Sequence, residues 1–592
     1  MNHTAIPPTA AIRARVHQGA LKRVTRFFAS TLTDAFIEAL QNARRSGATR
    51  VRVTVDTPAG HPGNCAPAPS ETRLSVTVTD DGAGITDPAV LLSFGENGWP
   101  DDLVAREDAA GMGILSLAQR GCRITSRTRT PDGHPGHGWS VNLEPEHFTG
   151  RSDAEVRPDD TAPHPSGTAV QFEAAESADA IHTAVANAAR HYPLPVLLEG
   201  VPGTEPGGVT LERRAFLDGA VHAEGWNGLV FGVFRDRWRG SFEPDLNFFG
   251  LTLPVRLPTV ETVHGGIWSV RADVHDCPGL ELVLPARKEV VENTFIEDMR
   301  RAARLAIYRA MAADPGPRPA FSDWTRARDA GIGLAPPPRV LRPWRPAVAD
   351  IDDWREPPKP APVAGDALIM TCDPDPPEAQ ALWRAAARAG IAESLFEADS
   401  RLEGYGWYDA LDRVTAIDTE VTANGKAWPL DKFPAPGRTG APAAPLPERP
   451  DAIRMTLTVK PANGPDRTLD LPSDLAFAGE AWSWVGEALP LVTADSSLEP
   501  HKLAELLRHA FFSASDDAEA DSRETQAVRF DEEALHIATR LLCSEDSALE
   551  ISIAETVRRE LFWLVPHDRK VEIFITRPDV RVTLGDPAET AT

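Results

Sequence analysis

Three short segments in the N-terminal third constrain the fold of this chain more than any other part. They read EALQNA at residues 38–43, DDGAGI at 80–85 and GMGILS at 111–116. The first places a carboxylate and an amide four positions apart, so that on a helix both side chains share one face. The other two contain glycines, which let the backbone turn tightly and approach a ligand. Exposed N–H groups where a helix begins, as expected after 111, favour phosphate.

The apolar pattern around these segments predicts the elements that carry them. A helix is expected over 33–45, and alternating strands over 51–55 and 74–79, with a proline- and glycine-rich loop between the strands at 58–70. A helix over 113–120 and strands over 123–128, 139–143 and 169–172 follow. This order predicts an α+β sandwich, with one mixed sheet and helices on one of its faces.

The residue types in these segments suit the binding and hydrolysis of a nucleotide. The amide oxygen of Asn42 is a suitable Mg²⁺ ligand, and Glu38 could orient or deprotonate a water. Asp80, at a strand end, could accept a hydrogen bond from an exocyclic amine, which selects adenine over guanine. Taken singly, each segment has a structural alternative: the polar face of a helix, a β-turn, or a glycine-rich loop before an ordinary helix.

In this order and spacing the segments resemble the GHKL ATPase superfamily, which contains gyrase, the ninety-kilodalton heat-shock chaperones, histidine kinases and MutL. The resemblance covers residues 20–175, and 176–312 more loosely. It implies a Bergerat-type α/β sandwich that binds ATP and Mg²⁺, with Asn42 on the metal, Glu38 on the attacking water and Asp80 on the adenine amino group. The other nucleotide contacts that it implies are Gly82, Gly84, Ile85, Gly111, Met112, Gly113, Ile114, Ser116 and Thr168.

The resemblance also implies a mobile lid and a basic residue supplied by a second domain. The lid would run from about 93 to 110, with Asn97 as a candidate phosphate contact. The segment LPARKEVV at 284–291 is similar to the catalytic loop of the chaperones, which makes Lys288 and Arg287 candidates for reaching the γ-phosphate. The alternative there is a charged strand-to-helix loop.

Two residues bear on the branch of the superfamily. Histidine kinases commonly carry Asn at the position of Glu38, so this glutamate favours a hydrolytic, chaperone-like or MutL-like branch. Chaperone and MutL members usually carry Asp where this chain has Arg45, which leaves the particular branch open.

Composition and proline density predict several further units. The expected order is an ATP-binding domain at 1–175, a transducer-like α+β domain at 176–312, a proline-rich linker at 313–365, a small α/β unit at 366–433, a second proline-rich linker at 434–450 and a C-terminal α+β domain at 451–592. Nothing in residues 366–592 identifies a substrate.

Charge and cysteine usage limit the partners and the compartment. A net charge of −25 over 592 residues disfavours non-specific binding to nucleic acid, although the basic stretches 13–26 and 300–309 leave local binding open. The five cysteines have no paired spacing, as expected in a reducing compartment. No apolar run reaches the ~18 residues needed to span a membrane. We therefore expect a cytoplasmic protein.

Together these observations predict an ATP-binding protein that acts as an Mg²⁺-dependent ATPase. Lid closure and ATP-dependent homodimerisation would drive a chaperone-like switch that acts on a protein client. One alternative is a DNA-transaction ATPase resembling MutL or a type IIB topoisomerase B subunit. Another is an ATP-switched interaction module of a mobile-element or defence system. The sequence leaves the biological process, the client and the rate of hydrolysis open.

Overall fold

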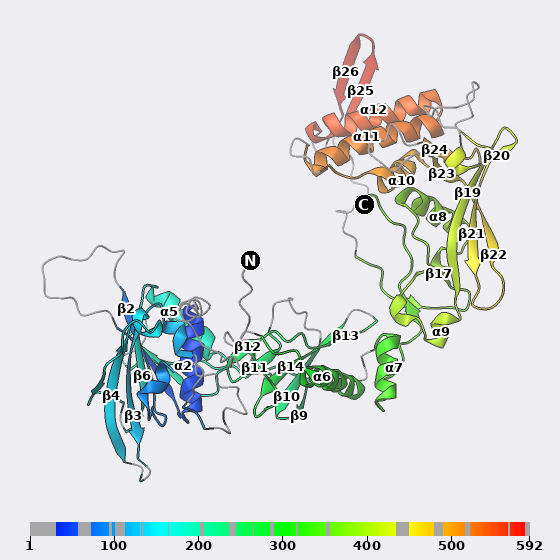
Figure 1. Cartoon of the computed structure of the whole chain (residues 1–592). Helices are drawn as coiled ribbons and strands as arrows, with labels where there is room; N and C mark the ends of the chain where they lie inside the picture. Colours follow the sequence, from blue (N-terminus) through cyan, green and yellow to red (C-terminus); the bar gives the residue numbers. More distant parts are fainter. Residues whose placement is uncertain are drawn as a thin grey trace, which may run out of the picture. The chain divides into compact units, whose positions relative to one another are not determined.

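The computed structural model of this chain divides into two compact units, residues 1–336 and 337–592, which are described separately (Figure 1). Both contain helices and several sheets, so the α+β fold class is confirmed. The structure describes residues 31–56, 73–93, 98–100, 103, 113–130, 132, 134–163, 165–201, 207–235, 244–263, 266–283, 289–314, 316, 318–350, 356–433, 449–478, 489–515, 521–565 and 569–585.

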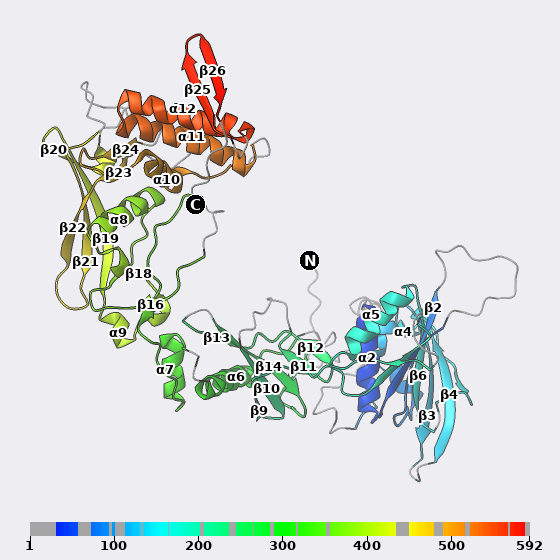
Figure 2. The same cartoon turned by 180° about the vertical axis from the view of Figure 1, so that it is seen from behind.

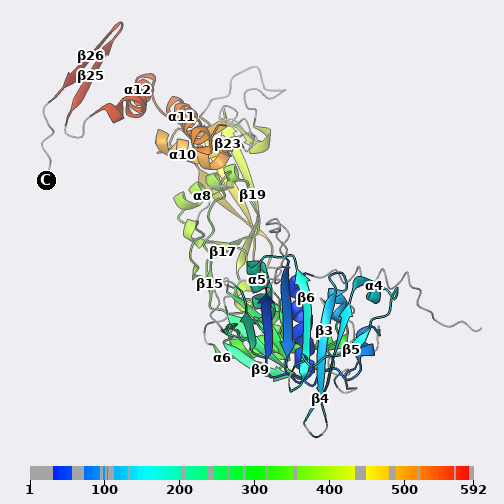
Figure 3. The ribbon, with the colours of Figure 1, turned by 90° about the vertical axis from the view of Figure 1, so that its left-hand side faces the viewer.

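The first sheet of unit 1 has eight strands in the order β5-β4-β3-β6-β2-β1-β7-β8. They are β1 (Val51–Asp56), β2 (Leu74–Asp80), β3 (Cys122–Arg129), β4 (Pro135–Leu143), β5 (Val156–Pro158), β6 (Gly167–Ala174), β7 (Val196–Glu199) and β8 (Val209–Thr210). Strands β3, β4, β5 and β6 of this sheet are labelled in Figure 3. The pair β1–β7 is parallel and the other pairs are antiparallel, so the sheet is mixed, as expected.

Helices α2 (Leu32–Arg45) and α5 (Ala178–Ala189) pack side by side on one face of this sheet, and the short α4 (Pro145–Phe148) adds to the same core (Figures 1 and 2). Helix α2 begins at Thr31, whose side chain accepts a hydrogen bond from the N–H of Asp34 in a reciprocal capping box. Its buried face includes Phe36 and Leu40, which are 1% and 2% exposed.

Two differences from the sequence prediction concern this layer. The expected helix over 113–120 is only a short 3-10 helix, η2 (Gly113–Leu117). Its backbone continues through hydrogen bonds between residues three apart, and in this conformation both Leu115 and Leu117 are buried. A second 3-10 helix, η1 (Pro88–Leu91), follows the second segment. The predicted domain end at 175 falls before α5, β7 and β8, yet these complete the first sheet and its core.

A second sheet of unit 1 follows, in the order β12-β11-β14-β10-β9, with β13 also paired to β14. Its strands are β9 (His222–Trp226), β10 (Leu229–Arg235), β11 (Leu246–Phe248), β12 (Leu251–Leu253), β13 (Thr259–Glu261) and β14 (Ile267–Val274). Helix α6 (Thr294–Ala313) packs on this sheet.

Helix α7 (Phe321–Asp329) lies within the segment 313–365 that was expected to be a linker. Its Ala327 is fully buried in the core of the second sheet, and the Trp324 indole N–H donates to the Leu334 carbonyl at 2.9 Å. The prolines of the segment 313–365 therefore lie on either side of a packed helix. Proline ends a helix but does not prevent the residues between two prolines from being buried.

The largest described sheet of unit 2 has the order β18-β17-β19-β21-β22, with β20 paired to β19, and β15-β16, β23-β24 and β25-β26 form two-stranded sheets. The elements of unit 2 are β15 (Val340–Leu341), β16 (Ala361–Pro362), β17 (Leu368–Met370), α8 (Pro376–Arg388), β18 (Leu395–Glu397), α9 (Gly406–Asp409), β19 (Asp412–Ala423), β20 (Lys426–Pro429), β21 (Ala452–Lys460), β22 (Arg467–Ser473), β23 (Leu475–Ala478), β24 (Leu489–Val492), α10 (Pro500–Phe511), α11 (Arg523–Leu542), α12 (Glu545–Leu561), β25 (Val571–Thr576) and β26 (Asp579–Leu584).

The sequence prediction separated 366–433 from 451–592, whereas the structure joins them. Strand β19 pairs with β21 from Arg413 to Thr422, and the core of this sheet draws on residues from both predicted units. A proline-rich stretch between two strands marks a connection, and it does not show whether those strands pair. In the part of the chain that the structure describes, no helix is long and apolar enough to cross a membrane.

A buried carboxylate fastens α8 to the turn between β22 and β23. The side chain of Asp474 is fully buried and accepts hydrogen bonds from Arg384 at 2.7 Å, Arg388 at 2.9 Å and Ser496 at 2.7 Å. Burial disfavours its charge, but these donors outweigh that cost and hold the pKa of Asp474 below its usual value.

Replacing Asp474 with alanine should lower the free energy of unfolding of unit 2 by about 3 kcal/mol, because two arginines lose a desolvated partner. Asp495 lies 3.9 Å from Arg388 and its side chain is 75% exposed, so Asp495→Ala should cost less than about 1 kcal/mol. Urea unfolding of the full chain, followed by circular dichroism, measures both. Equal losses would show that the Asp474 bridge contributes no more than a surface pair.

Candidate functional site

A cavity of about 360 Å³ in unit 1 lies among α2, β2, β6, η1 and η2. The three segments singled out in the sequence meet around it, although they are far apart along the chain. The predicted site residues that line it are Glu38, Asn42, Asp80, Gly84, Ile85, Gly113, Ile114 and Thr168.

The first and third segments meet where η2 begins. A Cβ atom added to Gly113 would lie 2.5 Å from Oε2 of Glu38 and 3.4 Å from Nδ2 of Asn42. A side chain at 113 would displace the flexible end of Glu38 from this position. The Glu38 carboxylate, the Asn42 amide and the Gly113 backbone are therefore close neighbours in the cavity lining.

Asp80 also lines the cavity, and its carboxylate is held by three donors. Its Oδ1 accepts hydrogen bonds from the N–H of Gly82 at 2.8 Å, the N–H of Thr168 at 3.4 Å and the hydroxyl of Ser46 at 3.4 Å. Burial raises the pKa of Asp80 to about 6, and the charge of Asp81 adds to the effect, while the three donors oppose it. Gly82 does not line the cavity. It packs against Ser46, and its N–H holds the Asp80 carboxylate.

The neighbouring Asp81 has a different environment. It accepts hydrogen bonds from the N–H and hydroxyl of Thr49 at 2.7 and 2.6 Å and from the N–H of Arg50 at 3.2 Å. Burial works against its charge, but these donors prevail and hold the pKa of Asp81 below its usual value. Asp81 thus fixes the start of β1, whereas Asp80 faces the cavity.

Ser126 joins the second segment to Thr168, a role that the sequence prediction missed. It is fully buried, accepts a hydrogen bond from the N–H of Ile85 at 2.8 Å and donates to the carbonyl of Gly167 at 3.1 Å. Its hydroxyl also lies 3.0 Å from that of Thr168. The one signal in the sequence is a serine at an inward-facing position of an alternating strand, two residues after buried Ile124.

Several predicted site residues cannot be placed at the cavity. Ser116 lies on η2 but does not line it. From the expected lid, Gly98 and Trp99 line the cavity, and the sequence prediction did not single out this tryptophan. Outside the described residues lie Asn97, Gly111, Met112, Arg287 and Lys288.

Comparisons with known proteins give only distant likenesses. No family model and no curated protein matches the sequence. Among solved structures, the B-subunit of DNA gyrase from Myxococcus xanthus matches with a TM-score of 0.28 and 16% identity, over 49% of this chain and 90% of that one. The ATPase region of Saccharomyces cerevisiae topoisomerase II matches with a TM-score of 0.28 and 11% identity, over 47% of this chain and 86% of that one.

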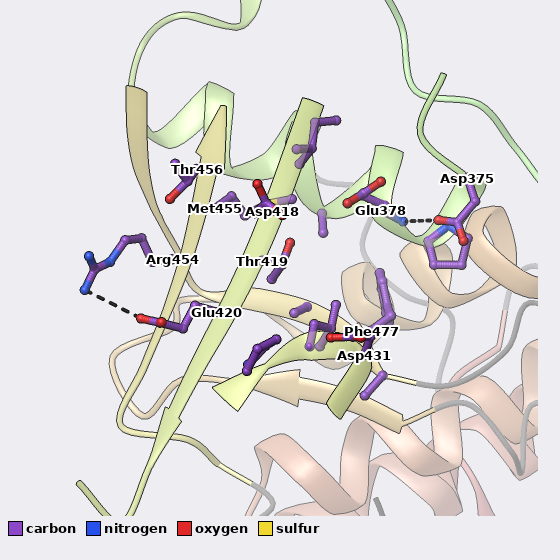
Figure 4. A pocket seen from close by; sticks show the side chains of 17 residues that line it. Asp375, Glu378, Asp418, Thr419, Glu420, Asp431, Arg454, Met455, Thr456 and Phe477 are labelled. Carbon is purple, nitrogen blue, oxygen red and sulfur yellow. Dashed lines mark hydrogen bonds and ion pairs between the residues drawn. The ribbon is translucent and has the colours of Figure 1, made fainter. Parts of the chain in front are cut away.

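A second cavity, of about 620 Å³, lies in unit 2 among α8, β19, β21 and β23 (Figure 4). Asp375, Glu378 and Asp418 line it, and Glu420 lies 3.9 Å from Arg454 at its rim. Burial and the charges of Asp375 and Asp418 raise the pKa of Glu378 to about 7. Within the described part of the chain, no group of three or more histidine, cysteine or acidic residues could hold a metal ion.

The two adjacent aspartates of unit 1 should respond to neutralisation in opposite ways. The folded pKa of Asp80 is raised from 3.8 to about 6, so its charge reduces stability above pH 6, and this penalty shrinks as the pH falls toward 3.8. Asp80→Asn keeps the accepting oxygen. It should raise the free energy of unfolding at pH 8 by on the order of 2 kcal/mol, and by less at pH 4.5.

Asp81→Asn is the matched control for this measurement. Its folded pKa is lowered, so its charge contributes stability above pH 3.8, and the substitution should destabilise the protein at pH 8. Urea unfolding at the two pH values measures both variants. The same sign for both at pH 8 would contradict the assigned environments.

Proposed function

We propose that this chain binds ATP in the cavity of unit 1 and hydrolyses it with Mg²⁺. The observation that supports this most is a single cavity lined both by Glu38, Asn42 and Gly113, which lie close together, and by Asp80 and Thr168. We assign the phosphates to the first group and the base to the second. The cavity wall also includes the apolar residues Val78, Ile124 and Val170, which suit the faces of a purine ring.

At the base end, Asp80 would accept a hydrogen bond from the adenine amino group. The donors on its Oδ1 hold the carboxylate in one orientation, and Thr168 adds a hydroxyl oriented by Ser126. Guanine has a carbonyl at that position and would meet a second acceptor, so the site would prefer adenine. The N–H of Gly82 holds the Asp80 carboxylate, and Gly84 and Ile85 line the cavity beside it.

At the phosphate end, Asn42 would hold Mg²⁺ through its amide oxygen, and Glu38 would orient the attacking water and take up its proton. The metal, when bound, neutralises phosphate charge. The residues fit the ion, because a neutral oxygen donor leaves room for the waters and phosphate oxygens that Mg²⁺ retains. Backbone N–H groups of 111–114 would contact the phosphates, with Ser116 nearby, and Lys288 or Arg287 would reach the γ-phosphate from the loop after β14.

We further propose that ATP closes a lid around Trp99 and brings two copies of unit 1 together, so that hydrolysis resets a switch acting on a protein client. The charge of −25 supports a protein client over DNA. A DNA-transaction ATPase is the alternative, and it would show DNA-stimulated hydrolysis that falls steeply with salt. ATPase rates measured with and without duplex DNA at 50 and 200 mM salt separate these two functions. The molecular mass of the protein in solution with ATP and with ADP tests whether ATP brings two copies together.

Glu38→Ala should reduce the rate of ATP hydrolysis at least about 100-fold, because the water loses its base, while ATP binding is retained. Glu173 lies on β6 with its side chain 61% exposed, so Glu173→Ala is a matched control that should hydrolyse ATP at the wild-type rate. Phosphate release and equilibrium binding of a fluorescent ATP analogue measure the two steps. A wild-type protein that binds no ATP would refute the site, and unaltered hydrolysis by Glu38→Ala would refute the role of Glu38.

A further inference from the structure

Helix α2 has a second polar face, which contacts the second sheet of unit 1. Gln41 and Arg44 are three positions apart and lie beside the face that carries Glu38 and Asn42. The Gln41 side chain donates from Nε2 to two successive carbonyls, those of Phe248 at 3.2 Å and Phe249 at 2.7 Å. The guanidinium carbon of Arg44 lies 3.8 Å from the centre of the Phe249 ring. One face of α2 thus lines the cavity, and the adjacent face contacts the turn between β11 and β12.

This turn is held in a fixed shape. Phe249 has φ of +52° and Gly250 has φ of +99°, and a residue other than glycine stays in that region only where its surroundings impose it. The N–H of Gly250 donates to Oδ1 of Asn247 at 2.8 Å, and Nδ2 of Asn247 donates to Asp273 on β14 at 2.7 Å. The side chain of Asn247 therefore ties this turn to β14.

Hydrogen bonding, and not packing alone, explains why a glutamine occupies this buried position. The Gln41 side chain is only 3% exposed, and its Oε1 has no hydrogen-bond partner among the described residues. An unsatisfied buried acceptor is costly, and an apolar side chain would avoid that cost. What an apolar side chain would lack is the pair of donated bonds to the turn. The hydroxyl of Tyr192, which packs against Gly250, adds a third bond to α2 through the Leu40 carbonyl at 2.6 Å.

We propose that Gln41 is a positioning residue for ATP hydrolysis: by fastening α2 to the turn at 248–250, it sets where Glu38 and Asn42 stand in the cavity. This proposal rests on the proposed function. Catalytic groups must stay within about 0.5 Å of their productive places, whereas one residue of helix rises about 1.5 Å, so a small slip of α2 disables the site. Coupling between two sites is reciprocal, so nucleotide on one face of α2 also changes how tightly the other face holds the second sheet.

The test is a kinetic and exchange comparison of Gln41→Leu with the wild type. The variant removes both donors, and kcat should fall about tenfold while the Kd of a non-hydrolysable ATP analogue stays within about twofold. Without nucleotide, amide hydrogen exchange should rise across β11–β12. In Gln41→Glu the introduced carboxyl repels the two carbonyls when charged and donates one hydrogen bond when protonated. Its kcat relative to wild type should therefore recover as the pH is lowered.

Gln380→Leu is the matched control. Gln380 is also 3% exposed and donates to a backbone carbonyl, that of Ala347 at 2.8 Å, but it lies in unit 2. The Gln380→Leu variant should leave kcat and the amide hydrogen exchange of β11–β12 unchanged. A wild-type kcat in Gln41→Leu, or equal loss of kcat and ATP binding, would overturn the positioning role alone. Absence of both binding and hydrolysis in the wild type would overturn the proposed function as well.

Discussion

The geometry of unit 1 depends on helix α2 being held from two sides. Its apolar face packs on the first sheet through Phe36 and Leu40, and Gln41 bonds to the second sheet, while the polar face between them carries Glu38 and Asn42 at the cavity. The helix cannot rotate or slide without breaking one of these two contacts. Of the two sheets, the first contributes described residues to the cavity lining, and the second acts on the cavity through its bonds to Gln41 on α2.

Burial makes the charge of Asp80 unfavourable in the cavity that this residue lines. Asp80 is ionised at neutral pH in surroundings that raise its pKa to about 6, whereas Asp81, one residue on, is stabilised as a charge. A hydrogen-bond donor from a ligand would relieve the first aspartate and leave the second unaffected. Functional sites commonly trade stability for binding in this way.

Local patterns in the sequence predicted the part of the site that depends on local geometry. Helix periodicity placed Glu38 and Asn42 together, whereas Gly113 was expected near the phosphates from its place at a helix start and from the resemblance; the structure brings all three to one cavity. Ser126 was missed because its partners at Ile85 and Thr168 are 41 and 42 residues away, so only the folded sheet brings them together. The joining of β19 to β21 was missed for the same reason. The roles of Lys288 and Arg287 stay predictions.

The place of β7 in the first sheet has a consequence for how the chain folds as it is made. Strand β1 lies between β2 and β7, and β7 comes well over a hundred residues after β1 in the sequence. Until β7 leaves the ribosome, β1 is an open edge that can pair with another nascent chain. The first sheet can be completed only after β7 and β8 are made, about a third of the way along the chain. Translation pauses before residue 196 would prolong the interval in which this protein is prone to aggregate.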